Sequence, residues 1–66
     1  MKNRIRAERA ELRMTQQALA DATGVSRQTI NAIETGRFVP STILALKIAQ
    51  VFQKPVEQIF QLEPGD

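Results

Sequence analysis

The feature that most constrains this chain is a turn of only two residues, Gly24 and Val25, between two segments that both have a helical pattern. The pattern predicts one helix over residues 16–23 and a second over residues 27–35. Helices this short are unstable alone in water, so their stability must come from packing. Because the connection between them is so tight, we expect the two helices to cross closely.

The residues at the ends of these two segments indicate the same boundaries. Thr15 and Ser26 each precede a segment and are typical N-cap residues, because their side-chain oxygens accept hydrogen bonds from free backbone N–H groups. Gly24 and Gly36 each follow a segment, where glycine readily adopts the left-handed conformation that ends a helix. The caps and the turn together predict a helix-turn-helix arrangement.

Three further helices are expected, over residues 3–13, 42–52 and 56–60. Asn3 is a possible N-cap of the first of these helices and Ser41 of the second. Pro55 suits the first turn of the third helix, although Lys54 is a poor cap beside the positive end of a helix dipole. The apolar residues of the segment 42–52 lie on nearly all sides of the predicted helix. We therefore expect this helix to be buried on several sides, at the centre of the domain.

Length and composition set the class of protein. The 66 residues, 42% of them apolar and 24% charged, are sufficient for one small globular domain over residues 1–66. The chain has no cysteine and no histidine, so we expect no disulfide, metal or cofactor. Its seven carboxylates are scattered without obvious pairing, and we expect no enzymatic activity. The longest apolar run, residues 43–46, is far short of the ~20 residues that cross a membrane. A cytoplasmic protein without membrane contact is therefore expected.

One cation lies where the first helix should face the core. Ile5 and Leu12 stand seven residues apart on one face of the predicted helix, and Arg9 is only about 40° from Ile5 around its axis. A buried charge is costly unless it is paired. Arg9 therefore requires a buried or half-buried carboxylate, unless its stem covers the core while its head reaches water.

The outward face of the segment 27–35 carries no carboxylate. On a helical wheel Ile30 and Ile33 lie inward, with Thr29 beside them. The outward face consists of Gln28, Asn31, Ala32 and Thr35, with Arg27 at its edge. These amides, hydroxyl, methyl and guanidinium match the base edges of the DNA major groove. An ordinary solvated helix face is the alternative, but such a face usually carries Glu and Lys.

Groups suited to phosphate lie on both sides of this face. Thr15, Gln16 and Gln17 begin the helix before the turn, where free N–H groups and the helix dipole attract anions. Arg37 follows the helix after the turn. Each has an ordinary explanation, since Thr and Gln are common at helix starts and Arg37 also serves solubility. Their shared spacing about one tight turn favours contacts with a DNA backbone.

The stretch TQQALADATGVSRQTINAIETGRFVPS resembles the phage-repressor and Cro type (xre-type) of helix-turn-helix transcriptional regulator, in its short single-domain form. The family's characteristic positions are occupied by Gln16, Leu19, Ala20, Gly24, Val25, Ser26, Ile30, Ile33, Glu34 and Gly36. LALKIAQVF and PVEQIF resemble its last two helices, whereas Thr23 stands where the family often has an aliphatic residue. The resemblance implies an all-α fold, a compact five-helix lambda-repressor-like DNA-binding domain whose second and third helices form the helix-turn-helix.

The resemblance also implies roles for particular residues. Members of the family commonly pair an arginine of the first helix with a glutamate near the end of the recognition helix, here Arg9 and Glu34. In similar short proteins the next loop approaches the DNA, which adds Phe38 and Val39, although Phe38 also suits a packing role. The candidate DNA-binding residues are Thr15, Gln16, Gln17, Ser26, Arg27, Gln28, Thr29, Asn31, Ala32, Thr35, Arg37, Phe38 and Val39.

These features predict a sequence-specific regulator of transcription, a repressor that occupies an operator. One such module buries only about 600–1,000 Å² on double-stranded DNA. We therefore expect a homodimer that reads both halves of a pseudo-palindromic operator. Ile59, Phe60 and Leu62 are the expected dimer interface, unless they close the core of the monomer instead. The alternative function is an antitoxin that mainly captures a protein partner.

Overall fold

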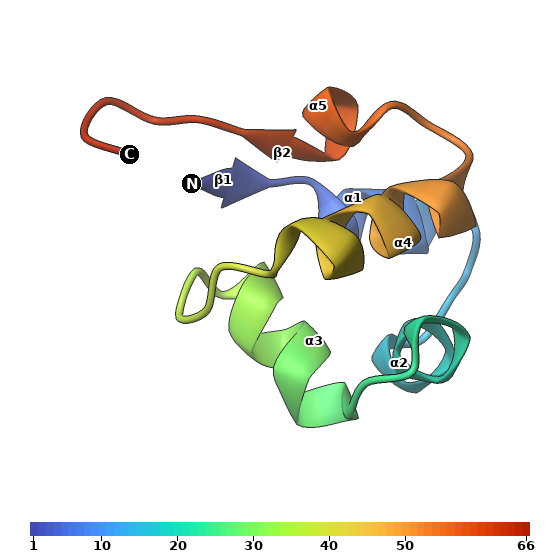
Figure 1. Cartoon of the computed structure of the whole chain (residues 1–66). Helices are drawn as coiled ribbons and strands as arrows, with labels where there is room; N and C mark the ends of the chain where they lie inside the picture. Colours follow the sequence, from blue (N-terminus) through green and yellow to red (C-terminus); the bar gives the residue numbers. More distant parts are fainter.

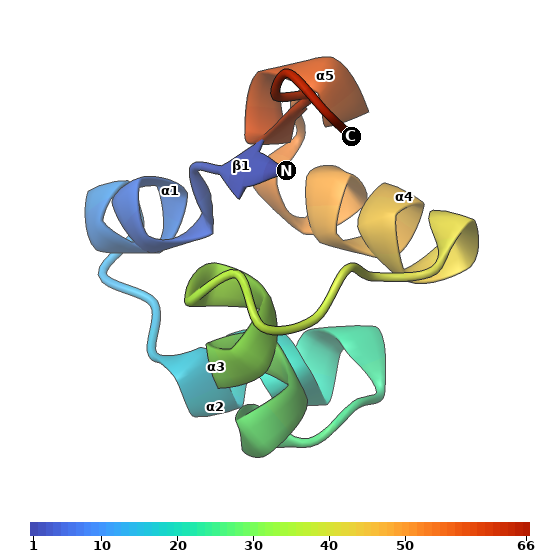
Figure 2. The ribbon, with the colours of Figure 1, turned by 90° about the vertical axis from the view of Figure 1, so that its left-hand side faces the viewer.

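The computed structural model describes residues 1–66, most of which lie in five helices (Figure 1). The elements are β1 (Lys2–Asn3), α1 (Ile5–Glu11), α2 (Gln16–Thr23), α3 (Arg27–Glu34), α4 (Thr42–Phe52), α5 (Val56–Ile59) and β2 (Phe60–Gln61). α2 and α3 cross in the lower half of Figure 2, and α1, α4 and α5 lie above them. The five-helix architecture predicted from the sequence is confirmed. None of the helices has the length and apolar character needed to cross a membrane.

Local capping chemistry fixes the ends of α2, α3 and α4 where it was predicted. The hydroxyls of Thr15, Ser26 and Ser41 accept hydrogen bonds from the N–H groups of Ala18, Thr29 and Leu44, at 3.0, 3.1 and 3.2 Å. Gly24 ends α2 in the left-handed conformation, with φ at 77°, and its N–H donates to the Ala20 carbonyl at 2.9 Å. This conformation turns the chain sharply into α3, and residues with a Cβ adopt it at a cost.

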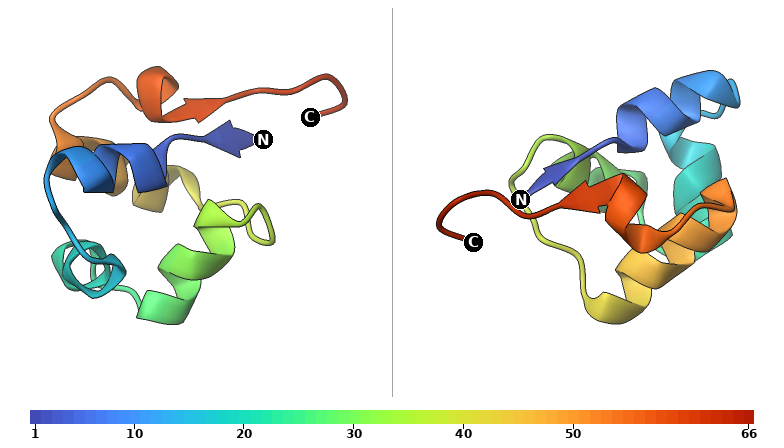
Figure 3. Two further views of the ribbon diagram at one scale, coloured as in Figure 1. Left: turned by 180° about the vertical axis from the view of Figure 1, so that it is seen from behind. Right: turned by 90° about the horizontal axis from the view of Figure 1, so that it is seen from above.

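A two-stranded antiparallel sheet, which has no signal in the sequence pattern, joins the two ends of the chain. Lys2 pairs with Gln61 and Asn3 with Phe60, and β1 and β2 run side by side in Figures 1 and 3. The fifth helix is therefore one residue shorter than the predicted segment 56–60. α5 ends at Ile59, and Phe60 is extended, with φ at −120° and ψ at 129°, because it belongs to this sheet.

The first helix is shorter than the predicted segment 3–13. Arg4 occupies the N-cap position of α1, and Asn3 lies in β1. The Asn3 Oδ1 nevertheless accepts a hydrogen bond from the Ile5 N–H at 3.2 Å. At the other end the chain leaves the helix after Glu11, and the side chain of Leu12 is 55% exposed. Leu12 therefore does not share the buried face of Ile5, which corrects the prediction.

One hydrophobic core draws on every helix and on β2. It consists of Ile5, Leu19, Ala20, Ile30, Ile33, Leu44, Ile48, Ala49, Phe52, Ile59 and Phe60. Thr23 is buried beside it, and its hydroxyl donates to the Leu19 carbonyl at 2.8 Å, so its polar group is satisfied. The prediction that α4 is buried on several sides was wrong, because Ile43 and Leu46 are 69% and 50% exposed.

An ion pair between a buried carboxylate and a half-buried lysine, which the sequence pattern does not predict, joins α1 to the turn after α4. Glu8 is only 3% exposed and accepts a hydrogen bond from the Lys54 Nζ at 2.7 Å. Arg4 Nε lies 3.6 Å from the other carboxylate oxygen. The hydrogen bond from Lys54 lowers the pKa of Glu8 below its ordinary value of 4.5, and the same bond raises the pKa of Lys54. Lys54 therefore pairs with Glu8 and is not the N-cap residue of α5, because Pro55 occupies that position.

Replacing Glu8 with glutamine is expected to flatten the acid branch of the stability profile. Because folding lowers the pKa of Glu8, the pair stabilises the fold above pH 4.5, and this stabilisation is lost as the pH falls through the lowered pKa. The free energy of unfolding should be measured by urea titration between about pH 7 and about pH 2. The exposed Glu57→Gln variant is the control. Equal acid sensitivity of Glu8→Gln and the wild type would contradict the prediction.

Candidate nucleic-acid interface

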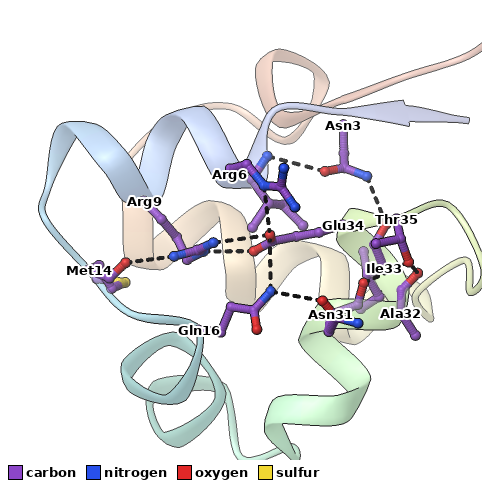
Figure 4. A network of polar contacts seen from close by, with 11 residues as sticks. Asn3, Arg6, Arg9, Met14, Gln16, Asn31, Ala32, Ile33, Glu34 and Thr35 are labelled. Carbon is purple, nitrogen blue, oxygen red and sulfur yellow. Dashed lines mark hydrogen bonds and ion pairs between the residues drawn. The ribbon is translucent and has the colours of Figure 1, made fainter.

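A buried ion pair fixes α3 against α1. Arg9 Nε donates to Glu34 Oε2 at 2.7 Å, and its Nη2 donates to Oε1 at 3.1 Å. Its remaining Nη1 donates to the Met14 carbonyl at 2.8 Å (Figure 4). The Glu34 side chain is 1% exposed and that of Arg9 14%. The structure thus brings together the two residues that the family resemblance paired, and Arg9 has the carboxylate that its place near the core requires.

The same network joins the start of α2 to α3. The Gln16 Nε2 donates to Asn31 Oδ1 at 3.1 Å and lies 3.3 Å from Glu34 Oε1. Both Gln16 and Asn31 are half-buried. The helical wheel predicts Asn31 on the outward face of α3. In the structure its oxygen holds Gln16, so within the free protein it helps to set the angle between α2 and α3.

The outward face of α3 presents two side chains that are free to bind. Arg27 and Gln28 are exposed, and neither has a hydrogen-bond partner within the chain. The other polar candidates are engaged locally. Ser26 and Thr29 share a hydrogen bond between their hydroxyls at 3.0 Å, and the Thr35 hydroxyl donates to the Asn31 carbonyl at 2.9 Å. Among the polar candidates on α3, Arg27 and Gln28 are therefore the most available.

The start of α2 lies at one side of α3. The Thr15 hydroxyl is used as the N-cap, and the exposed Gln17 Nε2 donates to Asp21 Oδ1 at 2.8 Å. The first backbone N–H groups of a helix have no partner within it, so those of Gln16 and Gln17 remain suited to an anion.

The loop after α3 lies beside its outward face. The N–H groups of Arg37 and Phe38 both donate to the Ala32 carbonyl, at 2.9 and 3.2 Å. Arg37 is exposed and unpaired, and Phe38 and Val39 are 48% and 64% exposed. Phe38 also lines a hollow together with Gln28, Thr29 and Ala32. The structure therefore places this aromatic ring against the candidate reading face, rather than in the core.

The three residues expected at a dimer interface do not share one environment. Ile59 is fully buried and Phe60 is 8% exposed, and both belong to the hydrophobic core of the chain itself. For these two residues the structure favours the alternative left open by the sequence, in which they close the core of the monomer. Leu62 is 81% exposed and remains available to a partner.

Two short helices joined by a tight turn at Gly24 and packed against three further helices are the arrangement of a helix-turn-helix protein of the phage-repressor type. A helix-turn-helix family model matches residues 5–59, and the chain belongs to that family. The chain is 51% identical over 66 residues to an uncharacterised helix-turn-helix transcriptional regulator of Methanocaldococcus jannaschii, with all of both chains covered. It is 46% identical over 63 residues to another, YgzD of Bacillus subtilis, covering 96% of each.

A solved structure shares the fold. The P22 c2 repressor, crystallised in complex with a synthetic operator, matches with a TM-score of 0.83 and 29% sequence identity, over 88% of each chain. The repressor-like five-helix fold predicted from the sequence is thereby confirmed. The short β1–β2 sheet is an addition to the expected all-α architecture.

Proposed function

We propose that this chain binds double-stranded DNA sequence-specifically, with α3 in the major groove, and represses transcription as a homodimer on a pseudo-palindromic operator. The observation that carries the proposal is the exposed, unpaired state of Arg27 and Gln28 on α3. A guanidinium can donate two hydrogen bonds to guanine O6 and N7, and a glutamine amide pairs with adenine N6 and N7. The operator complex of the similar P22 c2 repressor supports the same mode of binding.

The buried network supports sequence reading because it fixes the helix that would enter the groove. Glu34 is held by Arg9, and Asn31 by Gln16, so α3 is anchored to both α1 and α2. A rigid recognition helix loses little conformational entropy on binding. The free energy of its base contacts is then not spent on ordering the helix, and it can distinguish one DNA sequence from another.

Backbone contacts complete the proposed interface. The free N–H groups at the start of α2 suit one phosphate, and the exposed Arg37 suits another on the opposite side of α3. Such contacts set the register of α3 on the duplex without reading the sequence. Phe38 lies beside Gln28 in one hollow, and it adds an apolar surface that suits a thymine methyl or a sugar.

The homodimer is proposed from the size of the interface that one chain provides. A single module of this size buries about 600–1,000 Å² on DNA, and dimers of such modules read two half-sites one helical turn apart. Of the three residues predicted for the dimer interface, only the exposed Leu62 can contact a second copy without unfolding the core. We therefore place the contact at the residues after β2.

Selection of bound duplexes from a random pool tests the function as a whole. An enriched pseudo-palindrome is the expected result, and sedimentation of the complex should show two chains on each duplex. A single enriched half-site bound by one chain would contradict the homodimer and leave sequence-specific binding intact. A pool without any enriched sequence would contradict the proposed function itself.

Replacing Arg37 with alanine is expected to weaken binding to specific and scrambled duplexes alike, because it removes a phosphate contact. The slope of log affinity against log salt should fall by about 0.9 for each site occupied. The exposed Lys47 on α4, outside the proposed interface, provides the control Lys47→Ala. A loss confined to the specific duplex, or a slope equal to that of the wild type, would exclude the backbone role.

A further inference from the structure

A polar hollow lies between α1 and the C-terminal end of α3, and the function proposed above leaves it unused. Its lining includes Arg6 from α1 together with Glu34 and Thr35 from the end of α3. The side chain of Arg6 is 75% exposed, and its Nε lies 3.7 Å from Glu34 Oε1. This distance is too long for a strong hydrogen bond.

The charges around this hollow do not balance. Glu34 already accepts two hydrogen bonds from Arg9, one on each oxygen, at 2.7 and 3.1 Å. Arg6 is therefore a second cation beside one buried carboxylate. The neighbouring Arg4 differs, because its Nε faces the buried Glu8 at 3.6 Å. The cluster of Arg6, Arg9 and Glu34 thus carries one surplus positive charge at the surface.

Arg6 and Gln16, at the start of α2, share one partner. The Gln16 Nε2 and the Arg6 Nε both approach the same oxygen, Glu34 Oε1, at 3.3 and 3.7 Å. Figure 4 shows Arg6 and Gln16 on opposite sides of this carboxylate, one coming from α1 and the other from α2. A DNA strand that places a phosphate at the start of α2 would therefore pass close to Arg6.

We propose that Arg6 binds a second phosphate of the same DNA strand, so that α1 extends the backbone contact of α2. The inference rests on the proposed function, because it needs a duplex against α3. The incoming phosphate neutralises the surplus charge, and the exposed guanidinium can turn towards it without breaking the Arg9–Glu34 pair. A guanidinium donates two parallel hydrogen bonds to a phosphate, which an ammonium cannot do.

The test compares Arg6→Ala, Arg6→Gln and Arg6→Lys with the wild type on specific and scrambled duplexes over a range of salt concentrations. Arg6→Ala and Arg6→Gln should each reduce the slope of log affinity against log salt by about 0.9 per site, and weaken both duplexes equally. Arg6→Lys should restore the slope, because it restores the charge. Lys47→Ala is the matched control, and its slope should equal that of the wild type. Thermal melting should show that all four variants keep the wild-type fold.

Each other outcome overturns the inference. If the wild type binds its duplex and Arg6→Gln keeps the full slope, the α1 contact is wrong while the proposed function stands. If the wild type binds no duplex, both fail together. Inorganic phosphate is titrated calorimetrically without DNA, because a free anion offers the same chemistry. Saturable binding that disappears in Arg6→Ala would assign the hollow to a free anion instead.

Discussion

Replacing Glu34 with alanine is expected to reduce the free energy of unfolding by about 3–5 kcal/mol, because it leaves a largely buried arginine without its partner. Arg9 is only 14% exposed on its side chain, so water cannot replace the two hydrogen bonds that it loses. The amide of Gln16 loses a contact as well. Small proteins are stable by only about 5–15 kcal/mol, so the loss is a large share of the total, and the melting temperature of the variant should fall well below that of the wild type.

Urea denaturation followed by circular dichroism measures this loss, and Glu57→Ala is the matched control. Glu57 is exposed in the first turn of α5 and has no ion-pair partner, so its removal should change the free energy of unfolding by about 0.5 kcal/mol or less. Similar values for the two variants would show that the Arg9–Glu34 pair contributes nothing beyond a surface charge.

The double variant Arg9→Met with Glu34→Leu separates the effect of the stranded charge from the effect of changing side-chain shape at these two positions. Replacing both charges with apolar side chains removes the stranded cation, and such replacements are often neutral or stabilising in other proteins. We therefore expect the double variant to regain most of the stability that Glu34→Ala loses. A double variant as unstable as the single one would mean that the shape of the network, rather than its charge, holds α1 and α3 together.

The features that the sequence predicted correctly depend on neighbouring residues. Thr15, Ser26 and Ser41 cap their helices through a hydrogen bond to the third residue onward, and such a bond requires only the right residue type at the right spacing. The turn at Gly24 is local in the same sense. Arg9 was predictable for another reason, since a cation on an otherwise apolar stripe demands a partner.

The features that the sequence did not reveal join distant parts of the chain. β1 and β2 are two residues long, which is too short for an alternating pattern, and their pairing joins Asn3 to Phe60. Lys54 bonds to Glu8 across 46 positions. Glu8 lies on the same helical face as Ile5, and that placement was the one available signal. The apolar pattern of α4 could not indicate that Ile43 stays exposed, because periodicity does not show which sides of a helix are covered.

On the outward face of α3, too, the sequence predicted what depends on one helix and not what depends on contacts between helices. The wheel placed Gln28 outward and Arg27 at the edge of the same face, and both are exposed, because that direction follows from the buried Ile30 and Ile33. It could not show that Asn31 is held by Gln16, since that contact depends on how α2 crosses α3. The surplus charge at Arg6 could not be predicted from the sequence for the same reason, because its neighbour Glu34 lies on another helix.

Replacing Gln28 with alanine is expected to lower the affinity for the specific duplex by about 1–3 kcal/mol, or about 5- to 150-fold, while affinity for a scrambled duplex hardly changes. Gln28 is exposed, lacks a partner within the chain, and lies on a helix anchored on two sides. Its removal therefore takes away a base contact without disturbing the fold or the backbone contacts.

The exposed Gln58 on α5 supplies the control Gln58→Ala, which removes the same amide from a helix outside the interface and should leave both affinities unchanged. Titration of both duplexes at one fixed salt concentration separates the possible roles of Gln28. Equal weakening on both would make Gln28 a backbone contact, like Arg37. Selection from a random pool adds a positional test, because Gln28→Ala should relax the base preference at one position of each half-site and leave the others intact. An unchanged preference would mean that another side chain of α3 reads the operator.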